Sequence, residues 1–138
     1  MVVRRARTSD VPEIKRLIDI SSGRILLEKN LVTLYEAVQE FWVVEVGARV
    51  VGCGALHVLW SDLGEVRTVA VDPQVKGRGA GHLLVARLIE VARELELERL
   101  FVLTFRPWSF DAVTGPIRAA SLAWERLGAR WADAVAAE

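Results

Sequence analysis

The sequence lacks an excess of charge of either sign, long hydrophobic runs, and more than one cysteine. Its 18 basic residues balance 18 acidic ones, so no overall field attracts nucleic acid or an anionic membrane. The apolar runs are shorter than the roughly 20 residues that cross a bilayer, and the N-terminus is charged rather than an apolar signal core. Cys53 alone excludes an internal disulfide and suits a reducing compartment. We therefore expect a cytoplasmic protein without nucleic-acid or membrane partners.

A cluster of metal ligands is also absent from the pattern, because two separated histidines and one cysteine provide no set at metal-site spacing. The length of 138 residues, with 52% hydrophobic and 26% charged side chains, is typical of a globular protein with a substantial core. Neither an internal repeat nor a domain linker divides the chain. We interpret residues 1–138 as a single domain.

Alternating and helical patterns predict a mixed α+β fold. A first helix is expected over residues 8–20, where Ser9 can act as the cap and Pro12 lies in the first turn. A second helix is expected over Leu31–Gln39, and Gly47–Ala48 predicts a two-residue hairpin turn. The expected strands are Val2–Ala6, Phe41–Val46, residues 49–60, a strand that begins at Glu65, and Arg99–Phe105.

Two of these strands carry further signals. Gly52 and Gly54 weaken the strand over residues 49–60 and permit a bulge or a close backbone neighbour. Arg99–Phe105 shows almost no alternation, which predicts a central strand covered on both faces. The following tail changes character, and residues 117–138 are typical of one alanine-rich helix without a strand signal.

The stretch Val66–Leu84 leads from an apolar strand through alternating glycines into a helix. Gly77, Gly79 and Gly81 let the backbone approach a ligand closely, and bare N–H groups at a positive helix end favour phosphate. The helix itself is amphipathic and should pack on a sheet. Its apolar face is formed by Leu84, Leu88, Val91, Ala92 and Leu95, and its solvent face by Arg87, Glu90, Arg93 and Glu94.

Nucleotide-binding motifs fit this loop poorly. A Walker loop needs Gly-Lys followed by a hydroxyl residue, and a dinucleotide-binding loop needs G-x-G-x-x-G near the N-terminus. The stretch instead resembles motif A of the GNAT acetyltransferases, R/Q-x-x-G-x-G/A, at Lys76, Gly79 and Gly81. Lys76 departs from the preferred Arg or Gln, which keeps a donor but changes its geometry. The resemblance covers about residues 2–105.

The resemblance implies the GNAT acyl-CoA N-acyltransferase fold, with acetyl-CoA as cosubstrate and no metal. The pyrophosphate would lie on the backbone amides of the glycine-rich loop, and the pantetheine arm along the edge of the preceding strand. The cofactor-binding residues that it implies are Val69, Ala70, Val71, Lys76, Gly77, Arg78, Gly79, Ala80 and Gly81.

Several separate segments also resemble the GNAT domain of the N-acetylglutamate synthases, in their short stand-alone form. These segments are LLEKNL, EFWVVE, ARVVGCGALHVLW, LGEVRTVAVDP and ERLFVLTF. The resemblance implies that acetyl passes from acetyl-CoA to the α-amino group of an amino acid. The expected acceptor is L-glutamate, or glutamine in some short forms, in the first committed acylation of arginine biosynthesis.

Acetylation of an amino acid requires a base for the ammonium proton and cations for the carboxylates. Glu65 opens the strand that carries the expected acetyl-CoA contacts, so we expect it to be the general base, directly or through a water. It could equally be a solvated carboxylate. Arg67 shares its face and can bind a substrate carboxylate or pair with Glu65. Lys29 and Arg106 resemble substrate-carboxylate contacts of the family, with exposed salt bridges as their alternative role.

Three further side chains invite a catalytic interpretation. His57 lies on an apolar strand and is interpreted as a packed or hydrogen-bonded core residue. His82 lies in the first turn of the helix expected to face CoA. Cys53 is interpreted as a small core residue rather than a nucleophile, because no base stands at a recognisable spacing.

The tail departs from the family pattern in two ways. Trp124 stands where many GNAT enzymes carry a tyrosine that protonates the leaving thiolate, and the single tyrosine is Tyr35. Residues 106–138 also lack the HGF segment and further strands of the short synthases. The tail is therefore either divergent or the product of a frameshift or truncation, and its C-terminal strands are expected to be missing. An open sheet edge would then favour a homodimer.

These departures leave two alternatives to amino-acid acetylation. The chain could acetylate a protein N-terminus or another small amine. It could also be a non-catalytic CoA-binding or dimerising module.

Overall fold

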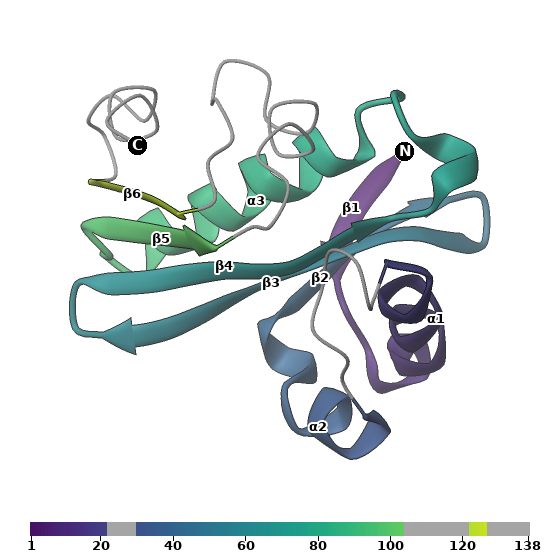
Figure 1. Ribbon diagram of the computed structural model, residues 1–138, viewed down its shortest axis with the longest axis horizontal. Helices are drawn as coiled ribbons and strands as arrows, with labels where there is room; N and C mark the ends of the chain where they lie inside the picture. Colours follow the sequence, from purple (N-terminus) through teal and green to yellow (C-terminus); the bar gives the residue numbers. More distant parts are fainter. Residues whose placement is uncertain (22–29, 104–121, 127–138) are drawn as a thin grey trace.

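The computed structural model describes residues 1–21, 30–103 and 122–126, which form one mixed sheet with helices on both faces (Figure 1). The strand order is β1-β2-β3-β4-β5-β6, and only the pair β4 and β5 is parallel. The expected α+β class is confirmed. The strands are β1 (Val2–Arg5), β2 (Phe41–Val46), β3 (Arg49–Trp60), β4 (Leu63–Val71), β5 (Arg99–Leu103) and β6 (Leu122–Arg126).

Helices cover the two faces of the sheet unequally. Helix α3 (Ala80–Glu94) lies along one face, and α1 (Val11–Ser21) and α2 (Leu31–Glu36) lie on the other (Figure 1). On the α3 side, Val85 and Leu88 pack against Leu56 of β3 and Val66 of β4. The core on the α1/α2 side contains Val11, Ile14, Leu17, Ile18, Leu34, Phe41, Val43, Val50, Cys53, Ala55 and Ala70. The sheet is therefore buried on both faces through its centre.

The first helix begins later than its sequence pattern predicts. A 3-10 turn, η1 (Thr8–Asp10), precedes α1, so Ser9 lies inside that turn and is not the cap of the helix. The Asp10 carboxylate accepts the Arg7 backbone N–H at 2.7 Å and pairs with the Arg4 guanidinium at 2.8 Å. Asp10 rather than Ser9 therefore supplies the polar side chain at this start.

Two hairpins join the strands at the centre of the sheet. Gly47 and Ala48 form the predicted turn between β2 and β3, and Gly47 has a φ of +62°. The predicted irregularity of β3 is also confirmed, since the register shifts near Gly52 against β2 and at Gly54 against β4. The second hairpin is tighter than expected, because β4 already begins at Leu63.

Three sequence-based expectations require correction. The predicted helix over residues 117–138 is wrong at Leu122–Arg126, which form β6 and pair antiparallel with β5. A free edge of backbone donors and acceptors along β5 outweighs the helical propensity of the alanine-rich sequence. A strand therefore stands where C-terminal strands were expected to be missing. The second helix ends at Glu36 and is followed by a 3-10 turn, η2 (Val38–Glu40).

The third correction concerns the end of α3. Leu95 is 52% exposed, whereas Leu97, beyond the helix, is buried and completes the core on this side. The helix ends at Glu94, and Glu96 has a positive φ of 63° that turns the chain so that Leu97 reaches the sheet. The other predicted apolar positions of α3 are buried.

Asp72 anchors the end of β4 to two other elements. Its side chain, only 4% exposed, accepts the Gln74 backbone N–H at 2.9 Å. Its Oδ2 also accepts from Arg16 of α1 at 3.3 Å and from Arg49 of β3 at 3.0 Å. The Gln74 N–H, followed by the two guanidinium groups, holds the pKa of the carboxyl below its usual value. Ionised Asp72 therefore stabilises the folded state.

The substitution Asp72→Asn tests this anchor. Since the pKa of Asp72 is lower in the folded than in the unfolded chain, its stabilisation is present above about pH 4. It is lost as the pH falls through the lower folded value. We expect Asp72→Asn to reduce the free energy of unfolding by about 1–3 kcal/mol at pH 7. Denaturant titrations at pH 7, 4 and 3 should show this difference shrinking with acid.

Asp19→Asn is the control, because Asp19 pairs with Lys15 on α1 with its side chain 46% exposed. An exposed pair of this kind contributes little, and this variant should stay within about 0.5 kcal/mol of the parent. A stability difference for Asp72→Asn that is the same at pH 7 and pH 3 would contradict the assignment.

Candidate active site

A bulge in β4 sends its side chains to two different faces. The register passes from Cys53–Ala70 to Ala55–Arg67, so an extra residue of β4 is left opposite β3, and Thr68 has a φ of +60°. In a regular strand, the side chains of Glu65, Arg67 and Val69 would all point to the same face of the sheet. With the bulge, Val69 packs against the α3 side.

The same bulge leaves Arg67 on the α1/α2 side. Its partner Ala55 belongs to the core cluster formed with α1 and α2, and Leu56, the next residue of β3, belongs to the α3 cluster. Glu65, two residues before Arg67, lies on the same side, and its carboxylate is 3.6 Å from the Arg67 guanidinium. The predicted shared face of Glu65 and Arg67 is therefore present.

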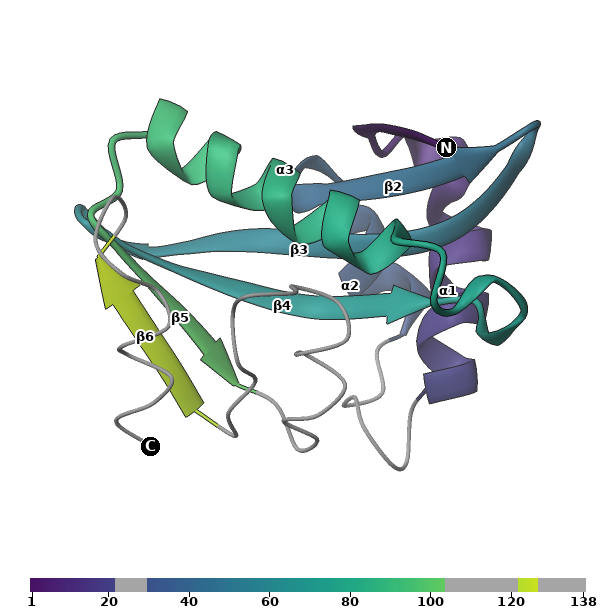
Figure 2. The same ribbon diagram turned by 90° about the horizontal axis from the view of Figure 1, so that it is seen from above.

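The strands β4 and β5 separate after a short parallel pairing. Leu63–Val66 pair with residues 99–102, whereas Arg67, Ala70 and Val71 of β4 pair with β3 only, among the strands that the structure describes. The two strands diverge visibly from this point (Figure 2). No described strand pairs with the backbone polar groups on this side of β4, and an extended ligand can pair with such groups as another strand would.

The loop between β4 and α3 has the backbone conformation that its glycines predict. Gly77 and Gly79 have φ values of +83° and +90°, and a Cβ added to either would meet nothing within 4 Å. Both residues are exposed, and Gly79 is the N-cap of α3 without a side-chain hydrogen bond to the helix. The first N–H groups of α3 follow directly after this exposed loop, and a helix has no carbonyl of its own to accept them.

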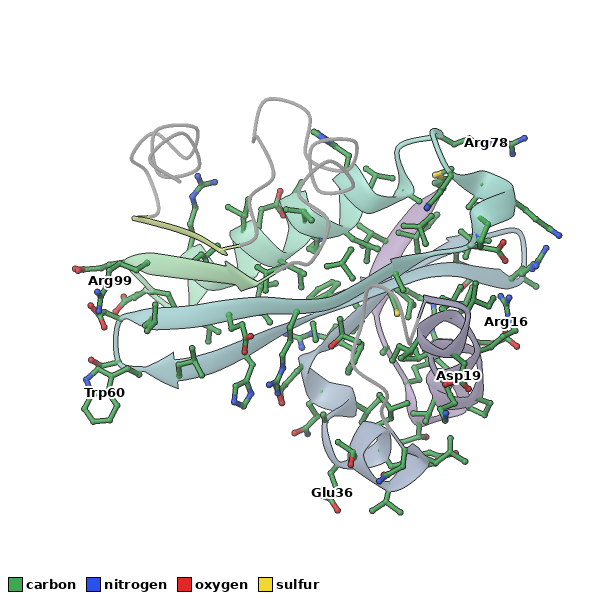
Figure 3. The ribbon with its side chains drawn as sticks, viewed as in Figure 1. Arg16, Asp19, Glu36, Trp60, Arg78 and Arg99 are labelled. Carbon is green, nitrogen blue, oxygen red and sulfur yellow. The ribbon has the colours of Figure 1, made fainter. Side chains whose placement is uncertain are left out.

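Two backbone donors of the loop are used in bonds within the loop itself. The N–H groups of Lys76 and Arg78 donate to Pro73 and Val75 at 3.4 and 3.3 Å, within the turn η3 (Pro73–Val75) and just after it. The side chains of Lys76 and Arg78 are exposed, and Arg78 extends away from the body of the protein (Figure 3). Cationic side chains and a helix N-terminus together favour a polyanion here.

Four charged or titratable side chains meet on the α1/α2 side of β3 and β4. His57 Nδ1 lies 2.6 Å from Glu40 Oε1, and an Arg67 nitrogen lies 3.6 Å from the same oxygen. The other Arg67 nitrogen reaches Glu65. His57 and Glu65 are direct partners across the strand pair. We call Glu40, His57, Glu65 and Arg67 the acidic cluster, because two carboxylates share one guanidinium.

Sequence reasoning placed Glu65 and Arg67 together but did not identify Glu40. Glu40 ends η2, and only the register of β2 and β3 brings this turn beside His57. His57 is hydrogen-bonded, as one of its two interpretations predicted, but its side chain is 37% exposed rather than packed in the core. Lys29 and Arg106 lie outside the described residues.

Cys53 and possible metal-ligand groups are the remaining candidates for chemistry among the described residues. Cys53 is completely buried, and burial raises the pKa of its thiol to about 12, so it is a core residue and not a nucleophile. Within residues 1–21, 30–103 and 122–126, no group of three or more His, Cys, Asp or Glu side chains could hold a metal ion. In the same ranges, no helix is long and apolar enough to span a membrane.

The described residues combine a parallel strand pair that separates, a glycine loop and a helix N-terminus. This combination is suited to an extended ligand that carries phosphates at one end. Comparison with known proteins identifies the class. Residues 13–113 match the acetyltransferase (GNAT) family, and the chain belongs to this family.

A sequence and a solved structure from Mycobacterium tuberculosis are among the most similar matches. An amino-acid acetyltransferase is 72% identical over 107 residues, which span 75% of this chain and 62% of the relative. The crystal structure of Rv2747 in complex with CoA and NLQ is 69% identical, with a TM-score of 0.77, and covers 80% of this chain and 68% of that one. The chain thus spans under two thirds of the length of the first of them.

A second similar structure comes from a longer chain. N-acetylglutamate synthase from Neisseria gonorrhoeae, complexed with coenzyme A and N-acetyl-glutamate, is 27% identical with a TM-score of 0.80. The match covers 91% of this chain and 35% of that one. The expected GNAT fold and the resemblance to the amino-acid acetyltransferases are therefore confirmed.

Proposed function

We propose that this chain transfers the acetyl group of acetyl-CoA to the α-amino group of an amino acid, with L-glutamate as the first candidate. The observation that carries the proposal is the separation of β4 from β5 after Val66, since it leaves the edge of β4 next to Glu65 and Arg67 without a strand partner among the described residues. The names and ligands of the relatives described above support the choice of acceptor. Under this proposal residues 1–138 act as one domain.

Acetyl-CoA would bind along the open edge of β4 and the loop that follows it. Backbone groups of residues 69–71 are positioned to pair with the pantetheine arm, whose amides need hydrogen-bond partners. The pyrophosphate would lie over residues 77–81, where Gly77 and Gly79 leave open space and the start of α3 provides N–H groups. Lys76 and Arg78 would add positive charge at the same place.

The acceptor would lie on the α1/α2 side, next to the acidic cluster. Two carboxylates against one guanidinium favour an ammonium group, which is the form an α-amino group mostly takes near neutral pH. Glu65 would remove its proton, directly or through a water, so that the free amine can attack the thioester carbonyl. The amine forms an amide bond to the acetyl carbon, and the bond from that carbon to the CoA sulfur breaks.

The carboxylates of the substrate need cations that the acidic cluster provides only in part. The Arg67 guanidinium lies 3.6 Å from the Glu40 carboxylate and 3.6 Å from the Glu65 carboxylate, and its side chain is 32% exposed. A carboxylate of the substrate could replace one of these two carboxylates. We keep Lys29, Arg67 and Arg106 as the proposed carboxylate contacts. The proposed partners are thus the two small molecules alone, and a homodimer, a cytoplasmic location and a role in arginine biosynthesis stay predictions.

The substitution Gly79→Ala tests the phosphate seat. A side chain at a φ of +90° strains the backbone, although the added methyl group itself meets no protein atom within 4 Å. The Cβ would then occupy the space in which the phosphates would approach. We expect calorimetric titration to show CoA affinity at least tenfold lower, which corresponds to about 1.4 kcal/mol. Gly47→Ala, at a φ of +62° with equally open surroundings, is the control for strain alone. Equal CoA affinity in both variants would contradict the assignment.

The substitution Glu65→Gln tests the proposed base. It keeps the shape of the side chain but cannot accept a proton, so kcat should fall by about 10²–10⁴-fold with CoA affinity unchanged. Turnover is measured as thiol release from acetyl-CoA with L-glutamate, L-glutamine and a short peptide as acceptors. An unchanged kcat would exclude Glu65. Turnover confined to the peptide would replace the proposed acceptor by a protein N-terminus.

A further inference from the structure

Proton balance sets a requirement that Glu65 alone does not meet. An ammonium acceptor loses two protons when it becomes a secondary amide, and the CoA thiolate takes up one of them. Each turnover therefore leaves one proton, which must reach solvent before Glu65 can act again. This inference rests on the proposed function, and it concerns where that proton goes.

His57 is the titratable side chain directly opposite Glu65. The two are partners in the antiparallel register of β3 and β4, a geometry that places Cβ atoms about 4.5–5.5 Å apart on one face. The His57 side chain is 37% exposed, against 18% for Glu65. Of the two groups, His57 therefore has more access to water.

Glu40 sets the state of the imidazole ring. Its Oε1 lies 2.6 Å from His57 Nδ1, so Nδ1 carries a hydrogen and donates it to the carboxylate. In this tautomer Nε2 carries the lone pair of the ring and can accept a proton, while the Glu40 carboxylate stays hydrogen-bonded at Nδ1. Arg67 holds both carboxylates of the cluster, with 3.6 Å to each.

We propose that the His57–Glu40 pair is the proton outlet of this site. The proton taken by Glu65 passes to His57 Nε2, directly or through a water, and leaves from there to solvent or buffer. Glu65 returns to the carboxylate and His57 to the neutral ring, so no group is consumed. His57 and Glu40 act through Glu65, and they are positioning residues rather than catalytic residues.

The chain offers a matched pair of substitutions to test this outlet. Glu40 and Glu45 both have side chains 29% exposed, and each has a carboxylate oxygen 2.6 Å from a side-chain nitrogen, Glu40 from His57 Nδ1 and Glu45 from Arg4 Nε. Glu40→Gln and Glu45→Gln therefore remove the same charge from the same kind of surroundings. Glu45 lies on β2 and contacts β1, with no member of the acidic cluster among its ion-pair partners.

We expect Glu40→Gln and His57→Ala to lower kcat roughly tenfold in dilute buffer, with the KM for acetyl-CoA unchanged. Added imidazole should restore most of kcat in His57→Ala, because it can accept the proton in the vacated space. It should have no effect on the parent or on Glu45→Gln, which should keep the parental kcat. Melting temperatures of all variants separate a loss of folding from a loss of proton transfer.

An unchanged kcat in Glu40→Gln and His57→Ala would overturn the inference and leave the proposed function standing. A reduced kcat in His57→Ala that does not respond to imidazole would also overturn it, because the role of His57 would then be structural. No turnover of the parent with any amino acid would instead overturn the proposed function together with the outlet.

Discussion

The hydrogen bonding of β4 is the constraint on which the site depends. A strand inside a sheet satisfies its backbone groups on both sides, but β4 pairs with β5 only over Leu63–Val66. Beyond that point it pairs with β3 alone among the described strands, and this one-sided stretch leads directly into the glycine loop. An extended ligand with amides along its length and phosphates at its end would satisfy both.

The bulge at Thr68 gives the two faces of β4 different tasks. After it, Val69 and Val71 pack toward α3 and support the helix whose N-terminus points at the loop. Before it, Glu65 and Arg67 lie with His57 and Glu40 on the α1/α2 side. Asp72, which directly follows β4, accepts hydrogen bonds from Arg16 of α1 and Arg49 of β3. These bonds hold the end of β4 in place relative to both elements.

Much of this arrangement follows from local sequence. The glycine loop, the amphipathic α3 and the hairpin at Gly47–Ala48 are encoded within short windows, and the structure has them where the patterns placed them. The backbone conformation of the loop at Gly77 and Gly79 and the shared face of Glu65 and Arg67 were predictable for the same reason. The exposure of Leu95 was not predictable from the helical pattern. The positive φ at Glu96 turns the chain, so that Leu97 rather than Leu95 is buried against the sheet.

Features that depend on distant pairing could not be read from the sequence. Glu40 meets His57 only through the register of β2 with β3, and nothing in either segment indicates the other. The strand β6 has an alanine-rich, helix-favouring sequence, and the free edge of β5 decides its structure. The residues expected from the family alone, Lys29 and Arg106, lie outside the described ranges.

Hydrogen exchange of backbone amides, measured with and without CoA, tests most directly whether the open edge of β4 is the cofactor site. The account predicts that CoA slows exchange at residues 67–71 and at Gly77–His82, while L-glutamate alone leaves both segments unchanged. If residues 67–71 exchange equally fast with and without saturating CoA, the separation of β4 from β5 does not serve to bind the cofactor, and the central claim fails.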